Sequence, residues 1–169
     1  SFAVSCFGLC DGSAIASGIG GTSPYQFNWY NTPTSQMNDT AFNLCASIYY
    51  VRGEDRNGCS MEDTILISQP SKINIVLDNV GDAKCAKTCN GSATILANGG
   101  LGDLTFSWKD GGVEPIRNDL CPGENMVLLT DENLCKDSLR FTVGAPDSLK
   151  AIITDTTHIF CLDVPSGSA

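Results

Sequence analysis

Cysteine is the reactive residue type that stands out in this sequence. Nine cysteines occur against a single histidine, His158. The closest pairs are Cys6/Cys10 and Cys85/Cys89, each with three intervening residues, and neither half of the chain has a second close pair. A zinc site usually adds histidine or a second C-x2-C element, so this spacing favours disulfides over metal ligation. Disulfides indicate an oxidising compartment outside the cytoplasm.

Residues suited to acid–base catalysis or calcium binding form no recognisable motif. The carboxylate pairs Glu54-Asp55 and Glu62-Asp63 flank a predicted hairpin, where solvated charges are the usual arrangement. The segments Asp55-Arg56-Asn57 and Asp131-Glu132-Asn133 place oxygen atoms on loops, but neither matches a D-x-D-x-D-G calcium loop. No G-x-S-x-G element or phosphate-binding loop occurs. We therefore predict that the chain is not an enzyme, has no catalytic residue or metal site, and needs no cofactor.

The charge balance restricts the possible partners. Nineteen acidic residues against ten basic ones give a net charge of −9, which repels nucleic acid. No apolar run approaches the roughly 18 residues of a membrane span, so we expect no membrane insertion. Residues 1–14 lack the basic and apolar regions of a signal peptide, as expected for a mature or excised segment.

An internal repeat organises the elements that must position the cysteines. Residues of the first half recur 79 residues later up to a tryptophan, and 76 residues later beyond it, so a loop has lost three residues. At an offset of 79 the matches are Cys6 with Cys85, Cys10 with Cys89, Gly12-Ser13-Ala14 with Gly91-Ser92-Ala93, Gly20-Gly21 with Gly99-Gly100, and Trp29 with Trp108. At an offset of 76 they are Leu44-Cys45 with Leu120-Cys121, Asp55 with Asp131, Asn57 with Asn133, Cys59 with Cys135, and Pro70 with Pro146.

The repeat starts a third time near the end of the chain. Cys161 lies 76 residues after Cys85, and Gly167-Ser168-Ala169 match Gly91-Ser92-Ala93, while Pro165 replaces the second cysteine. We predict repeat one at 1–70 (unit one), repeat two at 71–146 (unit two), and the start of a third repeat at 147–169. The final segment, 156–169, corresponds to residues 1–14 and is predicted to be a strand that could complete a sandwich in another subunit.

The local patterns indicate short antiparallel strands. Apolar and polar residues alternate over 25–29 and 104–108, and runs rich in apolar residues that favour strands occupy 64–67, 73–77, 139–143 and 151–153. Glycine-rich turns and Asn57-Gly58 separate them, and no ten-residue stretch has a helical period. The predicted fold is all-β: two tandem small Ig-like antiparallel β-sandwich repeats stapled by disulfides, plus the first strand of a third.

Spacing leaves more than one disulfide connectivity open. The third repeat keeps its first cysteine and has lost the second, which suggests that these two belong to different pairs. The preferred pairing is Cys6–Cys59, Cys10–Cys45, Cys85–Cys135 and Cys89–Cys121, with Cys161 bonded to a cysteine outside the sequence. The rival pairing in unit one is Cys6–Cys45 with Cys10–Cys59.

The ordered series of motifs resembles SprB-type repeats, which occur in gliding-motility and cell-surface adhesins of gliding bacteria. The resemblance covers nearly the whole chain, and the usual unit has two cysteines, at the places of Cys6 and Cys59. In unit two, Leu104, Asn125 and Leu134 replace Tyr25, Tyr49 and Gly58, which removes the Asn-Gly hairpin signal before Cys135. The motifs in unit one are Cys6-Phe7-Gly8, Asp11-Gly12-Ser13, Gly20 to Tyr25, Phe27-Asn28-Trp29, Leu44, Tyr49-Tyr50-Val51, Asp55 to Cys59, and Ile67 to Pro70.

The resemblance implies a surface protein without catalytic residues. It implies export by the type IX secretion route and an extracellular location on the bacterial cell surface. We predict a structural stalk repeat of a long adhesin or filament that supports adhesion and gliding motility, with neighbouring repeats or identical subunits as partners. Negative charge keeps such units soluble, and internal disulfides limit their extension under load.

Exposed tyrosines leave a carbohydrate-binding module of a surface protein as the alternative. Trp29 and Tyr49 are predicted to lie in the core. Tyr50 must face the opposite side of its strand from Tyr49, so Tyr30 and Tyr50 are the candidate contacts for a surface polysaccharide. Unit two has no tyrosine, so this site would belong to unit one alone.

A recurrent Asp-Ser/Thr pattern followed by an apolar residue or threonine suggests modification. It resembles the O-glycosylation acceptor of proteins exported by gliding bacteria and their relatives. The alternative reading is that Asp-Ser/Thr simply opens strands, because both residue types suit turns. The candidate acceptors are Thr40, Thr64, Ser138, Ser148 and Thr156.

Overall fold

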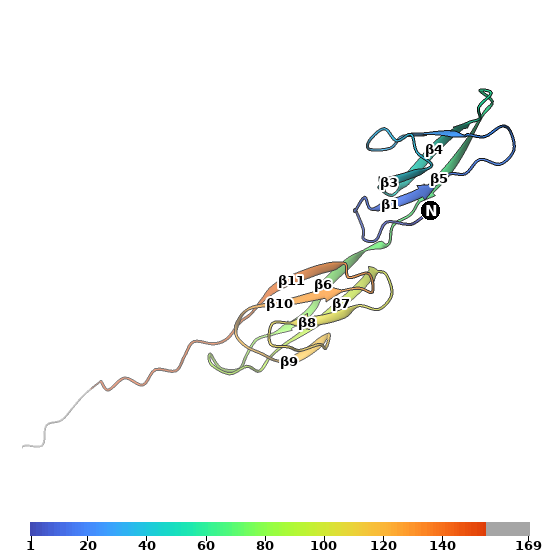
Figure 1. Cartoon of the computed structure of the whole chain (residues 1–169). Helices are drawn as coiled ribbons and strands as arrows, with labels where there is room; N and C mark the ends of the chain where they lie inside the picture. Colours follow the sequence, from blue (N-terminus) through green and yellow to red (C-terminus); the bar gives the residue numbers. More distant parts are fainter. Residues whose placement is uncertain (155–169) are drawn as a thin grey trace, which may run out of the picture.

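The computed structural model describes residues 1–154 and places two β-sandwich units end to end (Figure 1). Eleven strands account for all the regular structure of this part of the chain. No helix within it is long and apolar enough to cross a membrane. The candidate acceptor Thr156, His158, Cys161 and the predicted donor segment 156–169 lie outside the described residues.

Unit two contains a complete immunoglobulin-like sandwich. One sheet has the strand order β6-β7-β9 and the other β11-β10-β8, and all pairs are antiparallel. This order matches the A-B-E and G-F-C sheets of an immunoglobulin domain. The strands are β6 (Ser71–Gly81), β7 (Gly91–Gly100), β8 (Thr105–Trp108), β9 (Ile116–Leu120), β10 (Gly123–Thr130) and β11 (Lys136–Val143).

Unit one has the same order, and within the described residues it holds no counterpart of β6, whose equivalent positions would precede Ser1. Its sheets are β1-β3 and β2-β4-β5. The outer edge of β1 carries only one isolated bridge, between Phe2 and Ser13, which corresponds to the pair Gly81–Ser92 at the end of β6. The strands are β1 (Gly12–Ile15), β2 (Gln26–Tyr30), β3 (Thr40–Leu44), β4 (Ser47–Glu54) and β5 (Ser60–Ile67).

Each unit has its own hydrophobic core, and the two cores are not continuous across Pro70. In both, a buried tryptophan donates its indole N–H to a backbone carbonyl: Trp29 to Asn38 and Trp108 to Glu114. The unit-one core contains Val4, Ala14, Trp29, Ala41, Leu44, Tyr49 and Ile67. The unit-two core contains Ile73, Ala83, Ala93, Ile95, Trp108, Leu120, Val127, Leu129, Phe141 and Val143.

A tyrosine corner at the start of β4 shows how unit two tolerates its sequence drift. The Tyr49 hydroxyl donates to the carbonyl oxygen of Cys45 at 3.0 Å, which pins the loop between β3 and β4. In unit two Asn125 replaces this tyrosine, and its Nδ2 donates to the equivalent carbonyl of Cys121 at 3.0 Å. The corner is therefore kept with a shorter side chain.

The hairpin before Cys135 also forms, although its Asn-Gly signal is absent. Leu134 adopts the left-handed backbone conformation (φ 64°) that Gly58 has in unit one (φ 84°). The turn closes in both units by the same bond, from the N–H of Gly58 to the Asp55 carbonyl and from that of Leu134 to the Asp131 carbonyl, each at 3.0 Å. Leucine in this conformation is strained by about 1–2 kcal/mol.

The disulfides differ from the preferred pairing at one position of each repeat. Cys10–Cys45 and Cys89–Cys121 are formed, because the β1–β3 and β7–β9 pairings bring these residues together. Cys6, however, bonds with Cys135 of the other unit, 129 residues away, and not with Cys59 or Cys45. Cys85 therefore does not bond with Cys135, and both Cys59 and Cys85 are exposed free cysteines among residues 1–154.

The length of the sandwich explains this correction. Cys6 follows Val4, whose N–H binds the Ser68 carbonyl where the chain leaves unit one. Cys59 lies in the β4–β5 hairpin at the opposite end of the unit (Figure 1). A disulfide requires α-carbons within about 7 Å, so residues at the two ends of one sandwich cannot bond.

Candidate functional site

The contact between the two units is a covalent junction. The Cys6–Cys135 disulfide joins the first loop of unit one to the β10–β11 hairpin of unit two. Beside it, Asn133 Nδ2 donates to the Ser5 carbonyl oxygen at 2.9 Å. Consecutive units are therefore fixed at two places: by this bond and by the chain passing through Pro70.

The hairpin that presents Cys135 is held by one carboxylate. Asp131 is 4% exposed, and its Oδ1 accepts the Cys135 N–H at 2.9 Å while its Oδ2 accepts the Leu101 N–H at 2.9 Å. The Asp131 N–H in turn donates to the Cys135 carbonyl at 3.1 Å. Asp131 thus fixes both the hairpin and its position against the loop after β7.

The same frame holds Cys59 in unit one, where no disulfide is formed. Asp55 accepts the N–H of Cys59 at 2.9 Å and that of Thr22 at 3.0 Å, and the Asp55 N–H donates to the Cys59 carbonyl at 2.9 Å. The hydrogen bond from Thr22, followed by that from Cys59, lowers the pKa of the Asp55 carboxyl. Cys59 is therefore presented as Cys135 is, at the end of unit one that faces away from unit two.

The carboxylates considered for calcium, Asp55 and Asp131, thus serve as hairpin anchors. The described residues contain no group of three or more acidic, Cys or His side chains placed to hold a metal.

The loops that present Cys6 and Cys85 are also equivalent. The Cys6 carbonyl accepts the Leu9 N–H at 3.1 Å, and the Cys85 carbonyl accepts the Thr88 N–H at 3.3 Å. The residue before each cysteine donates its N–H to a side chain six positions ahead: Ser5 to Asp11 and Lys84 to Asn90, both at 2.9 Å. Cys85 thus lies in a Cys6-type loop at the far end of unit two.

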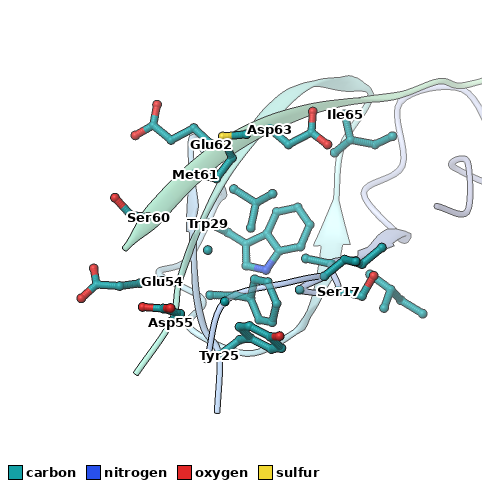
Figure 2. A pocket seen from close by; sticks show the side chains of 18 of the residues that line it. Ser17, Tyr25, Trp29, Glu54, Asp55, Ser60, Met61, Glu62, Asp63 and Ile65 are labelled. Carbon is teal, nitrogen blue, oxygen red and sulfur yellow. The ribbon is translucent and has the colours of Figure 1, made fainter. Parts of the chain in front are cut away.

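Unit one has a groove of about 630 Å³. It lies at the place that β6 covers in unit two. Trp29 lies at its floor, Tyr25 at its rim, and Glu62 and Asp63 line the β5 side (Figure 2). The segment after β1 forms the opposite wall. This segment, residues 16–21, corresponds to residues 95–100, which are part of β7.

Burial of equivalent core residues shows what the groove lacks. Val127 in unit two is 0% exposed and Phe141 is 9% exposed, whereas Val51 and Ile65 at the same places in unit one are only half-buried. In unit two, β6 supplies Ile73 to the core and packs Ile75 and Leu77 against it. The groove is thus the place that the apolar strand β6 fills in unit two.

The segment that follows unit two has the composition of such a strand but no partner within the described residues. Residues 147–154 are exposed, outside any strand, and extend away from the sandwich (Figure 1). Leu149 is fully exposed and Ile153 is 83% exposed. At the repeat offset of 76, residues 147–154 correspond to 71–78, the part of β6 that opens unit two.

The two tyrosines suggested as ligand contacts do come together. Tyr30 and Tyr50 are direct partners in the β2–β4 ladder and are 43% and 46% exposed on the outer face of the sheet. The structure places Thr64 opposite Tyr50 on β5. The result is a small aromatic face on unit one, and Lys109 and Met126 occupy the equivalent places in unit two.

The candidate glycosylation residues within 1–154 lie at or near the surface. Thr64 and Ser138 are exposed in β5 and β11, Ser148 is exposed after unit two, and Thr40 is half-buried at the start of β3. The N–H groups of Thr64 and Ser138 bind the carboxylate of the preceding aspartate at 2.7 and 2.8 Å. The aspartate therefore has a local structural role in this motif.

Sequence reasoning missed a buried cation in unit two. Arg117 is 8% exposed, donates to Asp110 at 2.6 Å and Asp119 at 2.7 Å, and lies 5.3 Å from the Trp108 ring centre. Hydrogen bonding from Arg117 lowers the pKa of Asp110 to about 2. Ala41 occupies this place in unit one, so no repeat signal pointed to the cluster.

Comparison with known proteins adds similarity of fold only. No protein-family model matches the chain, and no curated protein matches its sequence. Three N-terminal domains of the highly immunogenic outer capsid protein (Hoc) of bacteriophage RB49 share 13% identity with it over 83% of this chain and 56% of that one, with a TM-score of 0.48. The chain thus spans about half the length of that phage structure. The amphioxus IgVJ-C2 molecule (15% identity, 79% of this chain and 96% of that one, TM-score 0.32) and a Dscam structure solved for isoform specificity (12%, 72% and 38%, TM-score 0.36) are also similar.

Proposed function

We propose that this chain is a non-catalytic structural segment of a secreted bacterial surface filament or stalk, of the kind to which SprB-type repeats belong. The observation that carries the proposal is the Cys6–Cys135 disulfide between consecutive units. An internal disulfide stabilises a unit, whereas this one fixes one unit to the next. Such a bond suits a protein that transmits force or holds a distance between its units.

The surrounding chemistry supports this role. Two separate small cores, each with its own staple, suit a series of units that must fold in succession. The net charge of −9 keeps extended neighbours from aggregating. Export by the type IX route, O-glycans on the Asp-Ser/Thr motifs, and a part in adhesion and gliding belong to the same proposal.

Surface labelling tests the proposal directly. Antibodies raised against the purified chain should label intact, unpermeabilised cells of the source bacterium along extracellular fibres. Deleting unit two in the chromosome should shorten those fibres without removing them. Label confined to the cell interior, or fibres unchanged in length, would contradict a structural role.

Carbohydrate binding by unit one is the second candidate, and the Tyr30–Tyr50 pair favours it. Two tyrosine rings side by side on an exposed sheet face can stack on a sugar ring. A glycan array probed with the whole chain should show binding that Tyr50→Ala removes and Tyr25→Ala leaves unchanged. If the array shows no binding to any glycan, carbohydrate binding is excluded and the structural proposal is the one that remains.

A further inference from the structure

A hollow of about 320 Å³ lies on the outer face of the β2-β4-β5 sheet of unit one, on the side away from the core. Its volume falls within the range of about 300–1,000 Å³ in which small-molecule sites occur. Its lining residues are Gln26, Phe27, Asn28, Tyr30, Met37, Arg52 and Glu54. The cross-strand pairs of this face are Gln26 with Glu54, Asn28 with Arg52, and Tyr30 with Tyr50.

Tyr30 gives the hollow an aromatic ring that is held along the sheet. Asn28 and Tyr30 point to the same face of β2, because they are two positions apart. The Asn28 Nδ2 donates to the Tyr30 hydroxyl oxygen at 3.2 Å, so the ring leans along the strand over Asn28. Its partner Tyr50 is 46% exposed, and the two rings form an aromatic surface on which the C–H face of a sugar ring can stack.

Arg52 brings an unused hydrogen-bond donor to the same place. Its Nη2 donates to Ser60 Oγ at 3.1 Å and lies 3.4 Å from Glu54 Oε2. Its Nε is the one buried side-chain nitrogen or oxygen of residues 1–154 that has no hydrogen-bond partner. The Arg52 side chain as a whole is 43% exposed, so a ligand can reach the guanidinium. Because a buried donor without a partner is costly, a ligand oxygen that binds there is favoured.

The charges around the hollow favour a neutral ligand. Arg52 is the one cation on this face of the sheet, and it lies between two carboxylates: Glu54 on the same strand and Glu62, its partner on β5. Together with the net charge of −9, these carboxylates repel acidic sugars. A hydroxyl group, in contrast, can accept a hydrogen bond from Arg52 and donate one to Glu54 at the same time.

We propose that this hollow binds a neutral hexopyranose unit of a polysaccharide. The sugar ring stacks on Tyr30, its hydroxyl groups bridge Arg52 and Glu54, and the next sugar of the chain lies against Tyr50. The inference rests on carbohydrate binding, the second candidate function, and adds to it the class of sugar, the donor and the acceptor. It is independent of the structural role, which is proposed on the inter-unit disulfide.

Unit two lacks these side chains at the equivalent positions of its sheet. The replacements are Ser107 for Asn28, Lys109 for Tyr30, Leu128 for Arg52 and Thr130 for Glu54. The same molecule therefore contains an internal control, a unit of the same fold in which no sugar should bind.

Calorimetric titration of the full chain with defined oligosaccharides tests the class of sugar. The neutral probes are cellohexaose, laminarihexaose, mannohexaose and galactohexaose, and the acidic probe is hexagalacturonate. We expect at least one neutral probe to bind at a single site. We expect hexagalacturonate to bind at least about tenfold more weakly, because its carboxylates meet Glu54 and Glu62.

A matched pair of arginine variants tests the location. Arg52→Met removes the donors and keeps most of the apolar stem, and Arg140→Met makes the same change on β11 of unit two, where the arginine side chain is 68% exposed. We expect Arg52→Met to weaken binding at least about tenfold and Arg140→Met to leave it unchanged. Arg52→Lys keeps the charge without the guanidinium and should restore only part of the affinity. Circular dichroism checks that each variant is folded.

Backbone amide shifts of the isotope-labelled full chain map the site without any substitution. On addition of the tightest neutral probe, the shifts should concentrate at Gln26, Asn28 and Arg52. The amides of Ser107 and Leu128 should not move. Shifts centred on unit two would overturn the assigned site.

The outcomes separate this inference from the functions on which it rests. Binding of hexagalacturonate as tight as that of the neutral probes overturns the class of sugar and leaves carbohydrate binding. Neutral binding that Arg52→Met and Arg140→Met change equally overturns the site. Absence of binding by every probe overturns the inference and the carbohydrate candidate together, while fibre labelling on intact cells still decides the structural role.

Discussion

Under a stretching force, the Cys6–Cys135 disulfide should make this pair of units almost inextensible. The bond carries the load past the segment between its cysteines, a separation of 129 residues. At about 3.6 Å per residue, that segment represents about 460 Å of chain that cannot be extended. When the wild-type chain is pulled from residues 1 and 146, only the few residues outside the bridge should therefore add to its extension.

Removing the bridge gives a defined gain in length. In a chain with Cys6→Ser and Cys135→Ser, the other disulfides still enclose 35 and 32 residues. Unfolding both units then releases about 62 of the 129 residues, or about 220 Å of contour length. A reducing agent should release the enclosed remainder, about 240 Å more.

Single-molecule force spectroscopy measures these lengths directly. Cys59→Ser and Cys85→Ser are included in both proteins so that no disulfide exchange occurs. The parent chain with all its cysteines is stretched as a third protein: if its bonds were Cys6–Cys59 and Cys85–Cys135 instead, it would release the 26 residues between the two bridges, about 90 Å. An extension of that size before reduction would refute the reasoning.

Further predictions concern stability. Arg117→Met should remove an acid-sensitive part of unit-two stability: because the pKa of Asp110 is lowered to about 2 in the fold, this part is complete above about pH 4 and is lost as the pH falls toward 2. After allowance for the 54% exposure of the Asp110 side chain it amounts to about 1 kcal/mol, measurable as the difference in urea midpoint between pH 6 and pH 2.5. Leu134→Gly should stabilise unit two by about 1 kcal/mol in urea unfolding, because the strained φ of 64° suits glycine and the leucine side chain is 75% exposed. The control Leu139→Gly lies within a strand and should destabilise unit two. Val127→Ala should cost about 2 kcal/mol of unfolding free energy, while Val51→Ala, at the half-buried equivalent place, should cost less; urea unfolding of the two variants measures the difference. Proteolytic peptides that contain the Asp-Ser/Thr motifs, taken from protein isolated from the source bacterium, should exceed the masses calculated from the sequence if these motifs carry O-glycans; bare peptide masses would contradict this.

Much of the fold could be predicted from local pattern. The alternation around Trp29 and Trp108 predicted the strands β2 and β8. The repeat offsets predicted two all-β sandwiches, each with a disulfide, and these bonds link the β1–β3 and β7–β9 pairs. These features depend on residues near one another in a unit, where periodicity and turn chemistry are informative.

The junction could not be predicted, because sequence spacing does not show which end of a sandwich a cysteine occupies. Cys6 and Cys59 share a unit, so pairing them was the simpler assumption. The Asp55 frame places Cys59 at the end of unit one that faces away from unit two, and the Asp131 frame places Cys135 at the end of unit two that faces unit one; only the three-dimensional structure shows this. The strand at the start of repeat two was expected at 73–77, and β6 occupies Ser71–Gly81.

The 129-residue span of the inter-unit bond also orders the maturation of such a protein. If the chain leaves the cell amino-terminus first, Cys6 has no correct partner until the hairpin of unit two has emerged and folded. Oxidation would then lag one unit behind emergence, and the newest folded unit would always expose a thiol from its first loop. An oxidant that acted too early would trap Cys6 with a nearer cysteine, so correct maturation requires an isomerising or slow oxidant at the exit site.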